Sequence, residues 1–523
     1  NFYAFHIPTQ KNEFIANLGK EIQERGKISS IVHYHNSYFV GFLMDGILLL
    51  EKQKETNHYQ IQSLPINSGV FCLKKDRFQD VVWIGTDGQG VYLYSNPLYS
   101  IKSMVLSNYT EKIERPVRAI YLDDERTFWV GTKGNGILKI YDYEFDKNIS
   151  DCRAEVLTTS NSALSSNAVY CFAKSHRNLL WIGDEEGLTY YSYREKRIKS
   201  IPIRIGNEDF KYIHDIYETA DSELWLASVG MGVVKARIAG TPDNPVIVDA
   251  QRYIINDGEL GSNYFFTIYA ENEANLLFGN KGYGVFRYNE TTNGLEPVST
   301  HKYENMTLNN ILAISKDSSN NYLFGTSYGL IKYTSETSYQ LFNAKNGFLN
   351  NTIHAILRNS SDDFWLSTNL GLINFDTKRN VFRSYGFGDG LKVVEFSDGA
   401  AFRDSQTGTL FFGGINGVVA IRADGRPEQL YMPPVYFDKL SIFGEQYNLG
   451  EFLTRKKETE VLNLQYDQNF FSVSFASVDY LNGNNCTYFY KLKGLSDQWV
   501  NNGSESGVSF TNMAPGEYTV LGE

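Results

Sequence analysis

Several features that define common protein classes are scarce in this sequence. Among 523 residues there are only 4 cysteines, widely separated and without a Cys-x-x-Cys pair, so neither a dense disulfide framework nor a zinc knuckle is encoded. The cysteines leave the redox compartment open. Proline is limited to 12 residues, and no segment approaches the ~18 consecutive apolar residues of a membrane-spanning helix. The first residues lack the basic and apolar regions of a signal peptide, so if the parent protein is exported or anchored, we expect those segments outside this chain.

Basic residues are in the minority. The chain has 49 Lys and Arg against 60 Asp and Glu, a formal charge of −11. Such a charge repels a phosphate backbone or an anionic membrane surface unless a local basic patch compensates. We therefore expect no nucleic-acid partner for this region, and membrane contact only through segments outside it.

Aromatic residues and glycine are abundant. Aromatics make up 15% of the chain, glycine numbers 44, and charged residues reach 21%, a composition that suits short strands and tight turns and argues against disorder or a coiled coil. The length is several times the ~100–200 residues of a typical domain. At least two β-rich modules are expected.

A repeat organises most of the chain. An apolar stretch and a polar turn precede an aromatic-aliphatic-Gly-Thr sequence, clearest at Trp83-Ile84-Gly85-Thr86 and Trp129-Val130-Gly131-Thr132. The residue in the Gly place, which we call the register mark, is Gly, Ala or Ser at nine positions: 41, 85, 131, 183, 227, 279, 325, 367 and 413. Neighbouring marks are 42 to 52 residues apart.

Each unit predicts strands. In residues 117–141, two apolar strands flank an acidic turn, and Gly134 and Gly136 lead into a third strand. Three strands plus a variable outer strand in about 45 residues are typical of a propeller blade, whereas a helical solenoid would show i, i+3, i+4 spacing. The recurring Trp, Gly and Thr are interpreted as structural: the aromatic fills the gap between blades, and Gly permits close backbone approach.

From about Phe437 the repeat gives way to a different β pattern. Short alternating strands, such as residues 470–475, precede a Pro-Gly turn at Pro515-Gly516, a pattern that fits an antiparallel sandwich.

These motifs resemble a known family. The blades are similar to the periplasmic propeller repeats of hybrid two-component sensors from gut Bacteroidetes. The tail resembles the Ig-like module with recurrent tyrosines that follows those propellers, through Tyr488, Tyr490, Gly494, Trp499 and residues 514–518. The resemblance implies an all-β chain: the last blades of an incomplete first propeller at 1–105, a seven-bladed propeller at 106–432, and an Ig-like sandwich, incomplete at its C-terminus, at 433–523. One irregular ring of nine units is the alternative. Unclosed blades expose sheet edges, so we expect the first two to pack on a neighbour or on further protein.

The same resemblance implies a function. It predicts a periplasmic sensing region of an inner-membrane-anchored protein that binds an oligosaccharide, forms a homodimer and signals to a histidine kinase outside this chain, which controls carbohydrate-utilisation genes. The region itself is expected to be no enzyme and to need no cofactor. Two alternatives stay open: a polysaccharide-active propeller enzyme, either a glycosidase or a lyase, and a protein-interaction scaffold.

Candidate ligand-binding residues follow from the repeat. If the innermost strand comes first in each blade, the loop entering it and the loop between the second and third strands share one face around the central channel, where ligands usually collect. Aromatic faces there suit sugar C–H surfaces, while amides and cations suit hydroxyl or acid groups. The residues predicted on this basis are Arg118, Lys133, Asn135, Asn167, Tyr170, His214, Tyr264, Lys281, Tyr283, Tyr328, His354 and Asn369.

Catalytic and metal chemistry have weaker support. His214 and His354 occupy equivalent places in their repeats, which repeat homology explains better than a shared metal, and the 8 histidines form no His-x-His pair. Nucleophile elbows and phosphate-binding loops are absent from the sequence. Carboxylates are plentiful, but no pair stands out as a glycosidase acid and nucleophile.

Overall fold

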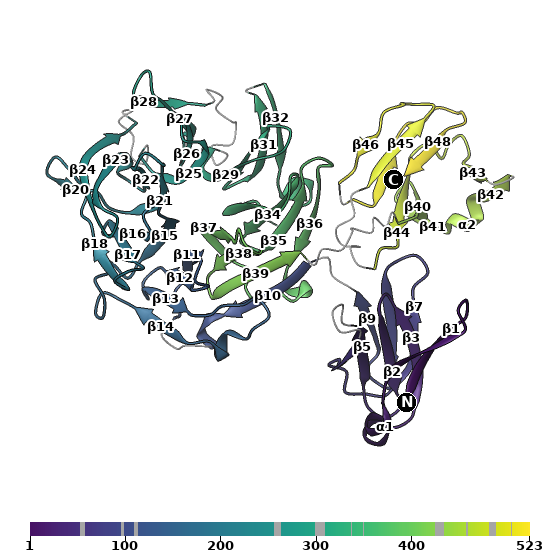
Figure 1. Cartoon of the computed structure of the whole chain (residues 1–523). Helices are drawn as coiled ribbons and strands as arrows, with labels where there is room; N and C mark the ends of the chain where they lie inside the picture. The colour runs from purple at the N-terminus through teal and green to yellow at the C-terminus, as the bar shows by residue number, and fades with distance from the viewer. Residues whose placement is uncertain are drawn as a thin grey trace.

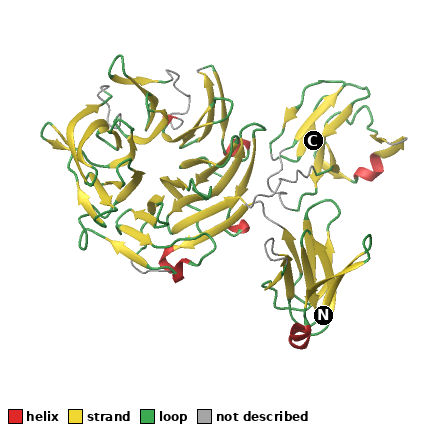
Figure 2. Cartoon of the chain, in the orientation of Figure 1, coloured by secondary structure: helices red, strands yellow, loops and turns green. Residues whose placement is uncertain are grey.

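The computed structural model describes residues 1–52, 58–95, 99–108, 113–255, 263–298, 309–335, 337–348, 350–423, 433–456, 459–480, 488–503 and 505–522. Strands dominate these residues (Figure 2), which confirms the expected all-β fold. Seven four-stranded antiparallel sheets, formed between residues 99 and 423, surround a common centre as a propeller (Figure 1). We call this part of the chain the ring.

Six sheets of the ring use four consecutive strands, with the first strand innermost (Figure 1). The first two of these sheets consist of β11 (Val117–Leu122), β12 (Phe128–Thr132), β13 (Ile137–Ile140) and β14 (Ala154–Leu157), and of β15 (Val169–Lys174), β16 (Leu179–Asp184), β17 (Leu188–Ser192) and β18 (Arg197–Ser200). The next two consist of β21 (Ile213–Glu218), β22 (Glu223–Ser228), β23 (Gly232–Thr241) and β24 (Asn244–Tyr253), and of β25 (Phe265–Asn272), β26 (Asn275–Asn280), β27 (Gly284–Asn289) and β28 (Gly294–Pro297). The last two consist of β29 (Ile311–Lys316), β30 (Tyr322–Thr326), β31 (Gly329–Ser335) and β32 (Ser338–Phe342), and of β33 (Ala355–Arg358), β34 (Asp363–Thr368), β35 (Gly371–Asp376) and β36 (Val381–Tyr385).

The seventh sheet closes the ring with a strand from upstream. Strands β37 (Phe396–Arg403), β38 (Leu410–Gly414) and β39 (Gly417–Ala423) are joined by β10 (Tyr99–Val105), which runs antiparallel to β39 from Tyr99↔Ala423 to Val105↔Gly417. The predicted division at residue 105 assigns this strand to the N-terminal blades, whereas the hydrogen bonds pair it with the ring. The domain limits themselves stay a prediction.

The register marks lie where adjacent sheets approach most closely. A Cβ added to Gly131 would stand 2.8 Å from Val169 Cγ1 of the next sheet, and one added to Gly325 would stand 2.9 Å from Ile353 Cγ2. At Gly413 the same contact, 2.6 Å, is made with Val117 Cγ1, so the last sheet meets the first. Glycine recurs here because a side chain would push neighbouring sheets apart.

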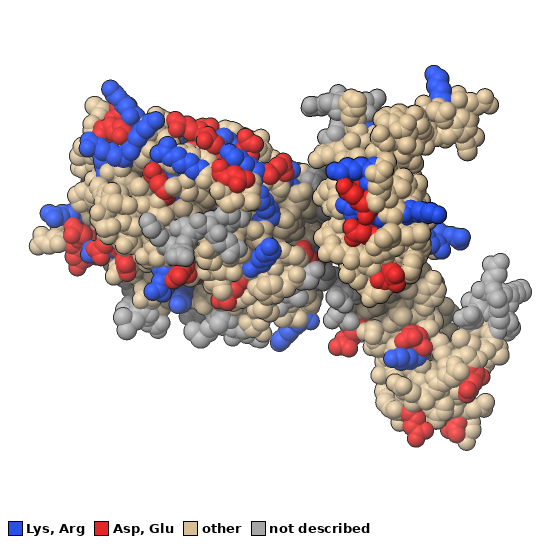
Figure 3. All heavy atoms as spheres, turned by 90° about the horizontal axis from the view of Figure 1, so that it is seen from below, with Lys and Arg blue, Asp and Glu red and all other residues tan. Residues whose placement is uncertain are grey.

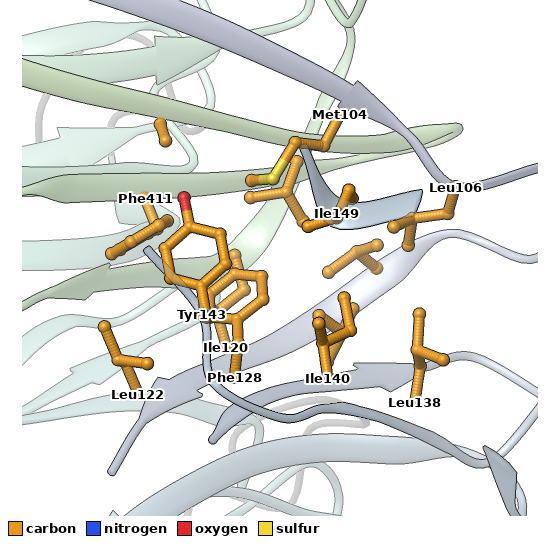
Figure 4. Packing of buried hydrophobic residues seen from close by; sticks show 14 of the residues in the cluster. Met104, Leu106, Ile120, Leu122, Phe128, Leu138, Ile140, Tyr143, Ile149 and Phe411 are labelled. Atoms are coloured by element: carbon orange, nitrogen blue, oxygen red, sulfur yellow. The ribbon is translucent and has the colours of Figure 1, made fainter. Parts of the chain in front are cut away.

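The hydrophobic core is divided among the gaps between sheets. Figure 4 shows the gap where the ring closes: Phe128 and Tyr143 stack with centroids 4.8 Å apart, Phe411 of β38 lies 4.9 Å from Phe128, and Met104 of β10 is fully buried beside them. Four of the recurring tryptophans, at 129, 181, 225 and 365, are at most 2% exposed. Their predicted role as fillers between blades is consistent with this burial.

Two further sheets precede the ring. The first is β3 (Ile28–Tyr34), β4 (Ser37–Phe42), β5 (Ile47–Lys52) and β6 (Tyr59–Ser63), and the second is β7 (Val70–Lys75), β8 (Val81–Thr86) and β9 (Val91–Ser95). A hairpin of β1 (Phe2–His6) and β2 (Lys11–Ala16) and the helix α1 (Gly19–Arg25) lead into them. We call the two sheets the N-terminal sheets.

The C-terminal part is a small sandwich. One sheet contains β40 (Val435–Ile442), β41 (Glu445–Tyr447), β44 (Phe471–Ser477) and β47 (Gly507–Phe510), and the other β45 (Phe489–Lys493), β46 (Val500–Asn501) and β48 (Thr519–Gly522). Leu440, Val473, Phe475 and Leu492 form a shared core. The remaining short elements are β19 (Arg204–Ile205), β20 (Glu208–Asp209), β42 (Leu453–Lys456), β43 (Thr459–Leu462), α2 (Leu449–Phe452) and 3-10 turns at Leu106–Asn108, Ile149–Asp151, Ala344–Asn346 and Phe387–Asp389.

The surface mixes charges of both signs. On the face shown in Figure 3, blue basic and red acidic side chains lie beside one another over the ring and the adjoining parts. Exposed pairs elsewhere in the described structure follow the same pattern, for example Lys174 with Asp124 at 2.6 Å and Arg204 with Asp209 at 2.9 Å. Among the described residues no helix is both long and apolar enough to span a bilayer.

Candidate ligand-binding site

The channel-facing residues are presented by β-bulges. On β11 the ladder pairs Val117 with Thr132 and then Ala119 with Gly131, so Arg118 is an extra residue opposite no partner. The same one-residue shift leaves Tyr170 unpaired on β15, His214 on β21, Phe266 on β25 and Leu312 on β29. A bulge re-aims its side chain and is frequent near functional sites. The sequence predicted three of these five residues as ligand contacts.

Bulge residues of consecutive sheets touch one another. The Tyr170 and His214 rings stack with centroids 4.4 Å apart and planes 17° apart, and Phe266 meets the His214 ring edge-on at 5.5 Å. On the other side, the Arg118 guanidinium lies 6.0 Å from the centre of the Tyr170 ring. Neighbouring innermost strands therefore supply a continuous series of aromatic rings and one cation.

An ion-pair network extends the series. Arg118 Nη1 lies 3.5 Å from Asp398 Oδ2, and the other carboxylate oxygen, Oδ1, is 2.5 Å from His354 Nδ1. His354 Nε2 is in turn 2.6 Å from Asn369 Oδ1. We call Phe266, His214, Tyr170, Arg118, Asp398 and His354 the channel arc. The arc takes one residue from each of six of the seven sheets or from the loop entering them.

The arc is shielded but reachable by solvent. The exposed fraction of the side chain is 14% for Arg118, 28% for Asp398 and 11% for His354. Burial, helped by the positive charges of Arg118 and Lys133 and opposed by Asp398, lowers the pKa of His214 to about 3. His214 is therefore a neutral ring at neutral pH.

The Asp398 carboxylate stays ionised. Its burial would raise its pKa, but the hydrogen bond from His354 and the charges of His354 and Arg118 outweigh burial and hold the pKa below its ordinary value. Neutral aromatic faces thus lie beside a fixed carboxylate and guanidinium. This combination can pack against an apolar ring face and bind the polar groups around it.

The other predicted residues have different surroundings. Asn135 Oδ1 accepts the backbone N–H groups of Glu114 and Arg115 at 3.1 and 2.7 Å, and Asn167 Oδ1 accepts that of Thr159 at 2.9 Å. These amides support the loops beside the channel. Lys133 is exposed and close enough to His214 to affect its pKa.

The remaining four residues lie on loops farther along the ring. Lys281 is exposed, and Tyr264 is half-buried with its carbonyl oxygen accepting the Lys281 N–H at 2.9 Å. Tyr283 and Tyr328 are half-buried against the cores between sheets. The structure therefore brings Arg118, Tyr170, His214, His354 and Asn369 together, and it places the other seven predicted residues around them or in supporting roles.

Asp398 and Phe266 were missed by the sequence reasoning. Phe266 has the same place after Phe265 in its repeat unit as His214 has after Ile213. Aligning the repeat units would therefore have identified Phe266. Asp398 could not be found in this way. Between Phe396↔Gly414 and Ala401↔Phe412, β37 advances five residues while β38 advances two, so three extra residues displace the register.

No metal centre is formed by the described residues: they contain no group of three or more His, Cys, Asp or Glu side chains placed to hold an ion. The arc itself offers a single carboxylate, Asp398, to a ligand.

The fold and the site together define a β-propeller protein with aromatic and charged side chains in contact across its innermost strands, followed by a C-terminal β-sandwich. Residues 479–521, within that sandwich, match the family model described as the Y_Y_Y domain. The chain is similar to a protein of Formosa agariphila named Histidine kinase P4, with 24% identity over 423 residues, which cover 77% of this chain and 29% of that protein. The chain thus aligns with under a third of that relative.

Solved structures resemble nearly the whole chain. One, described as the extracellular domain of a hybrid two-component system from B. thetaiotaomicron, has a TM-score of 0.60 and 24% identity and covers 99% of this chain and 67% of its own. A second extracellular domain of this kind from the same organism has a TM-score of 0.51 and 18% identity, covering 95% and 66%. The predicted resemblance to the sensor region of such systems is confirmed, and the shared property is the fold.

Proposed function

We propose that this chain is the extracytoplasmic sensing region of a hybrid two-component sensor and that it binds an oligosaccharide at the channel arc. The observation that carries the proposal is the contact series from Phe266 to His354, which combines stacked rings with an ionised guanidinium–carboxylate pair. Sugars present apolar C–H faces and a rim of hydroxyl groups, so they match both halves of this surface.

The arc also suggests how a ligand is discriminated. Asp398 and Asn369 offer oxygen atoms to hydroxyl groups, while Arg118 and exposed Lys133 favour a ligand that carries acid groups. We therefore expect uronate-containing oligosaccharides to bind more tightly than neutral ones of the same length.

In this proposal the region lies in the periplasm as part of an inner-membrane-anchored homodimer. Binding shifts the arrangement of the modules and thereby the activity of a histidine kinase outside this chain, which controls carbohydrate-utilisation genes. A ligand can cause such a shift only if it binds one arrangement better than the other.

Calorimetry of the chain with plant, host and microbial oligosaccharides, each in neutral and uronate-containing forms, tests the proposal. We expect at least one uronate-containing ligand to bind and to be recovered unchanged. Binding by none of them would contradict the proposal, and recovery of shortened or unsaturated products would favour a polysaccharide-active enzyme.

A further inference from the structure

One carboxylate departs from the repeat of the ring. Asp215 follows the bulge residue His214 on β21 and pairs with the register mark Ala227. In the other five sheets built from four consecutive strands, the residue opposite the register mark is small and uncharged: Ala119, Cys171, Thr267, Ala313 and Ala355. The sheets of the ring can therefore pack without a carboxylate at this place.

The Asp215 carboxylate links two neighbouring innermost strands. Its Oδ1 accepts the N–H of Ile216 on its own strand at 2.9 Å, and its Oδ2 accepts the N–H of Ile268 on β25 at 2.7 Å. The Thr267 side chain donates to the same carboxylate. Thr267 and Ile268 directly follow Phe266, so the carboxylate after one bulge holds the two residues after the next bulge.

These two bulges present the aromatic half of the channel arc. The His214 and Phe266 rings meet edge-on, with centroids 5.5 Å apart and planes 81° apart. Between β15 and β21 the equivalent contact is weaker, because Cys171 donates a thiol to the carbonyl oxygen of Ile213 at 3.6 Å. Hydrogen bonds to an ionised acceptor are stronger than those between neutral groups. The firmer link thus joins the strands that carry His214 and Phe266.

The carboxylate has an energetic cost at this place. Burial raises the pKa of Asp215 to about 6, and the hydrogen bonds from Ile268, Ile216 and Thr267 act in the opposite direction. Withdrawing a charged group from water costs free energy unless its partners offset that cost. Since alanine suffices at the same place in three other sheets, closing the ring does not explain the carboxylate, whereas presenting Phe266 does.

We propose that Asp215 is a positioning residue of the channel arc, whose carboxylate holds the Phe266 bulge against His214 so that the two rings form one face for a sugar. The inference rests on the proposed function and deepens it, since it assigns the geometry of the aromatic half to a residue outside the arc. Asp215 acts through the rings and not through a contact with the ligand. A face held in advance binds at a lower entropic cost.

Hydrogen exchange of the ligand-free chain, read by mass spectrometry on peptides of residues 265–272, tests the link itself. Asp215→Ala removes the acceptor of the Ile268 N–H, so we expect this amide to exchange at least about fivefold faster, the factor that corresponds to ~1 kcal/mol. Cys171→Ala, at the equivalent place of the preceding sheet, is the matched control and should leave these peptides unchanged. Unchanged exchange in Asp215→Ala would overturn the proposal, provided that peptides of β22 show that the sheet is still folded.

Calorimetry then tests the effect on binding. The probes are tetrasaccharides of polygalacturonate, hyaluronan and alginate, and the variants are compared on the one that the unmodified chain binds most tightly. We expect Asp215→Ala to weaken binding at least about fivefold and Cys171→Ala to bind normally. Normal affinity of Asp215→Ala alongside faster exchange would overturn the positioning role.

A double-mutant cycle separates positioning from an independent contribution. If Asp215 acts through the Phe266 ring, adding Asp215→Ala to Phe266→Ala should weaken binding by at most about twofold more. Additive losses would mean that Asp215 acts in another way and would also overturn the proposal. If the unmodified chain binds none of the probes, the proposed function fails, and the exchange result alone decides whether Asp215 holds the Phe266 bulge.

Discussion

Lys139 is the most enclosed cation of the ring. It is 3% exposed, yet its Nζ lies 4.5 Å from the centre of the Trp129 ring and 4.6 and 4.9 Å from those of Tyr191 and Tyr141. Lys139 is the cross-strand partner of Trp129, and its Nζ also lies 3.3 Å from Glu155 Oε1. Cation–π attraction is strongest when the charge is withdrawn from water, so this lysine helps to hold two adjacent sheets together.

Lys139→Met should therefore lower the stability of the ring by about 1–2 kcal/mol, because Met fills the space but leaves the Tyr141 and Tyr191 hydroxyl groups without their partner. Urea unfolding measures the change. Lys235 faces Trp225 in the same way but is 25% exposed, so Lys235→Met is the control and should cost less. Equal losses for both variants would contradict the role of burial.

His214 predicts a pH dependence. Its pKa of about 3 lies below the ~6.5 of an unfolded histidine, so between these values the unfolded chain binds a proton that the folded chain excludes. This group therefore makes the fold less stable as pH falls from about 6.5 towards 3. Buried Asp184 and Asp215, whose pKa values burial raises to about 6, act in the opposite direction between about 6 and 3.9.

Comparing the unmodified chain with the His214→Phe variant separates the contribution of His214 to the pH dependence of stability from that of the other titratable groups. The unfolding free energy of the unmodified chain should fall by roughly 1–2 kcal/mol more than that of the variant between pH 6.5 and pH 5. Phe is a suitable replacement because Phe266 occupies the equivalent bulge. Parallel pH profiles of the two proteins would contradict this, because they would mean that folding does not change the pKa of His214.

At the scale of elements, the ring depends on how closely its sheets approach. In the ring, a glycine at a register mark lies against the residue that precedes the bulge of the next sheet, as Gly131 lies against Val169, and the bulge residue that follows contacts its neighbours around the centre of the ring. Consecutive residues of one innermost strand therefore pack against the neighbouring sheet and present a side chain to a ligand. This explains why a repeat read for its structural residues also located Arg118, Tyr170 and His214.

Gly413→Ala tests the closure. The added Cβ would stand 2.6 Å from Val117 Cγ1 and 3.1 Å from Ala400 Cβ, so we expect a loss of about 1–3 kcal/mol from overpacking. Gly386→Ala is the control, since its added Cβ would meet nothing nearer than 3.9 Å and its φ of −139° suits alanine. Thermal unfolding distinguishes them; an unchanged midpoint in Gly413→Ala would mean that the sheets adjust freely.

The sequence predicts the strands and residues that recur in every repeat unit. It does not predict the strands, residues and hydrogen bonds that depart from the repeat. Strand β10 is an outermost strand and carries no register mark, and its partner β39 is more than 300 residues away in the sequence. Asp398 was hidden by three extra residues in β37, and the loop-supporting hydrogen bonds of Asn135 and Asn167 depend on backbone geometry that residue types do not reveal. The contact of Gln79 with Val478 likewise joins segments without any shared motif.

At the scale of the whole molecule, three parts follow one another: the N-terminal sheets, the ring and the sandwich (Figure 1). The ring contributes the channel arc, and the N-terminal sheets contact the sandwich through Gln79 and Trp83. Under the function proposed above, the ring recognises the ligand, and a bound ligand must favour one relative arrangement of the three parts over another.

The central claim is that the channel arc binds the oligosaccharide. Its most direct test is the dissociation constant of Tyr170→Ala for a uronate-containing oligosaccharide that binds the unmodified chain, with Tyr328→Ala, outside the arc, as the control. Loss of one stacking face should weaken binding at least about tenfold, a change of ~1.4 kcal/mol. We expect this loss for Tyr170→Ala and near-normal affinity for Tyr328→Ala; a Tyr170→Ala protein that folds and binds as tightly as the unmodified chain would contradict the account.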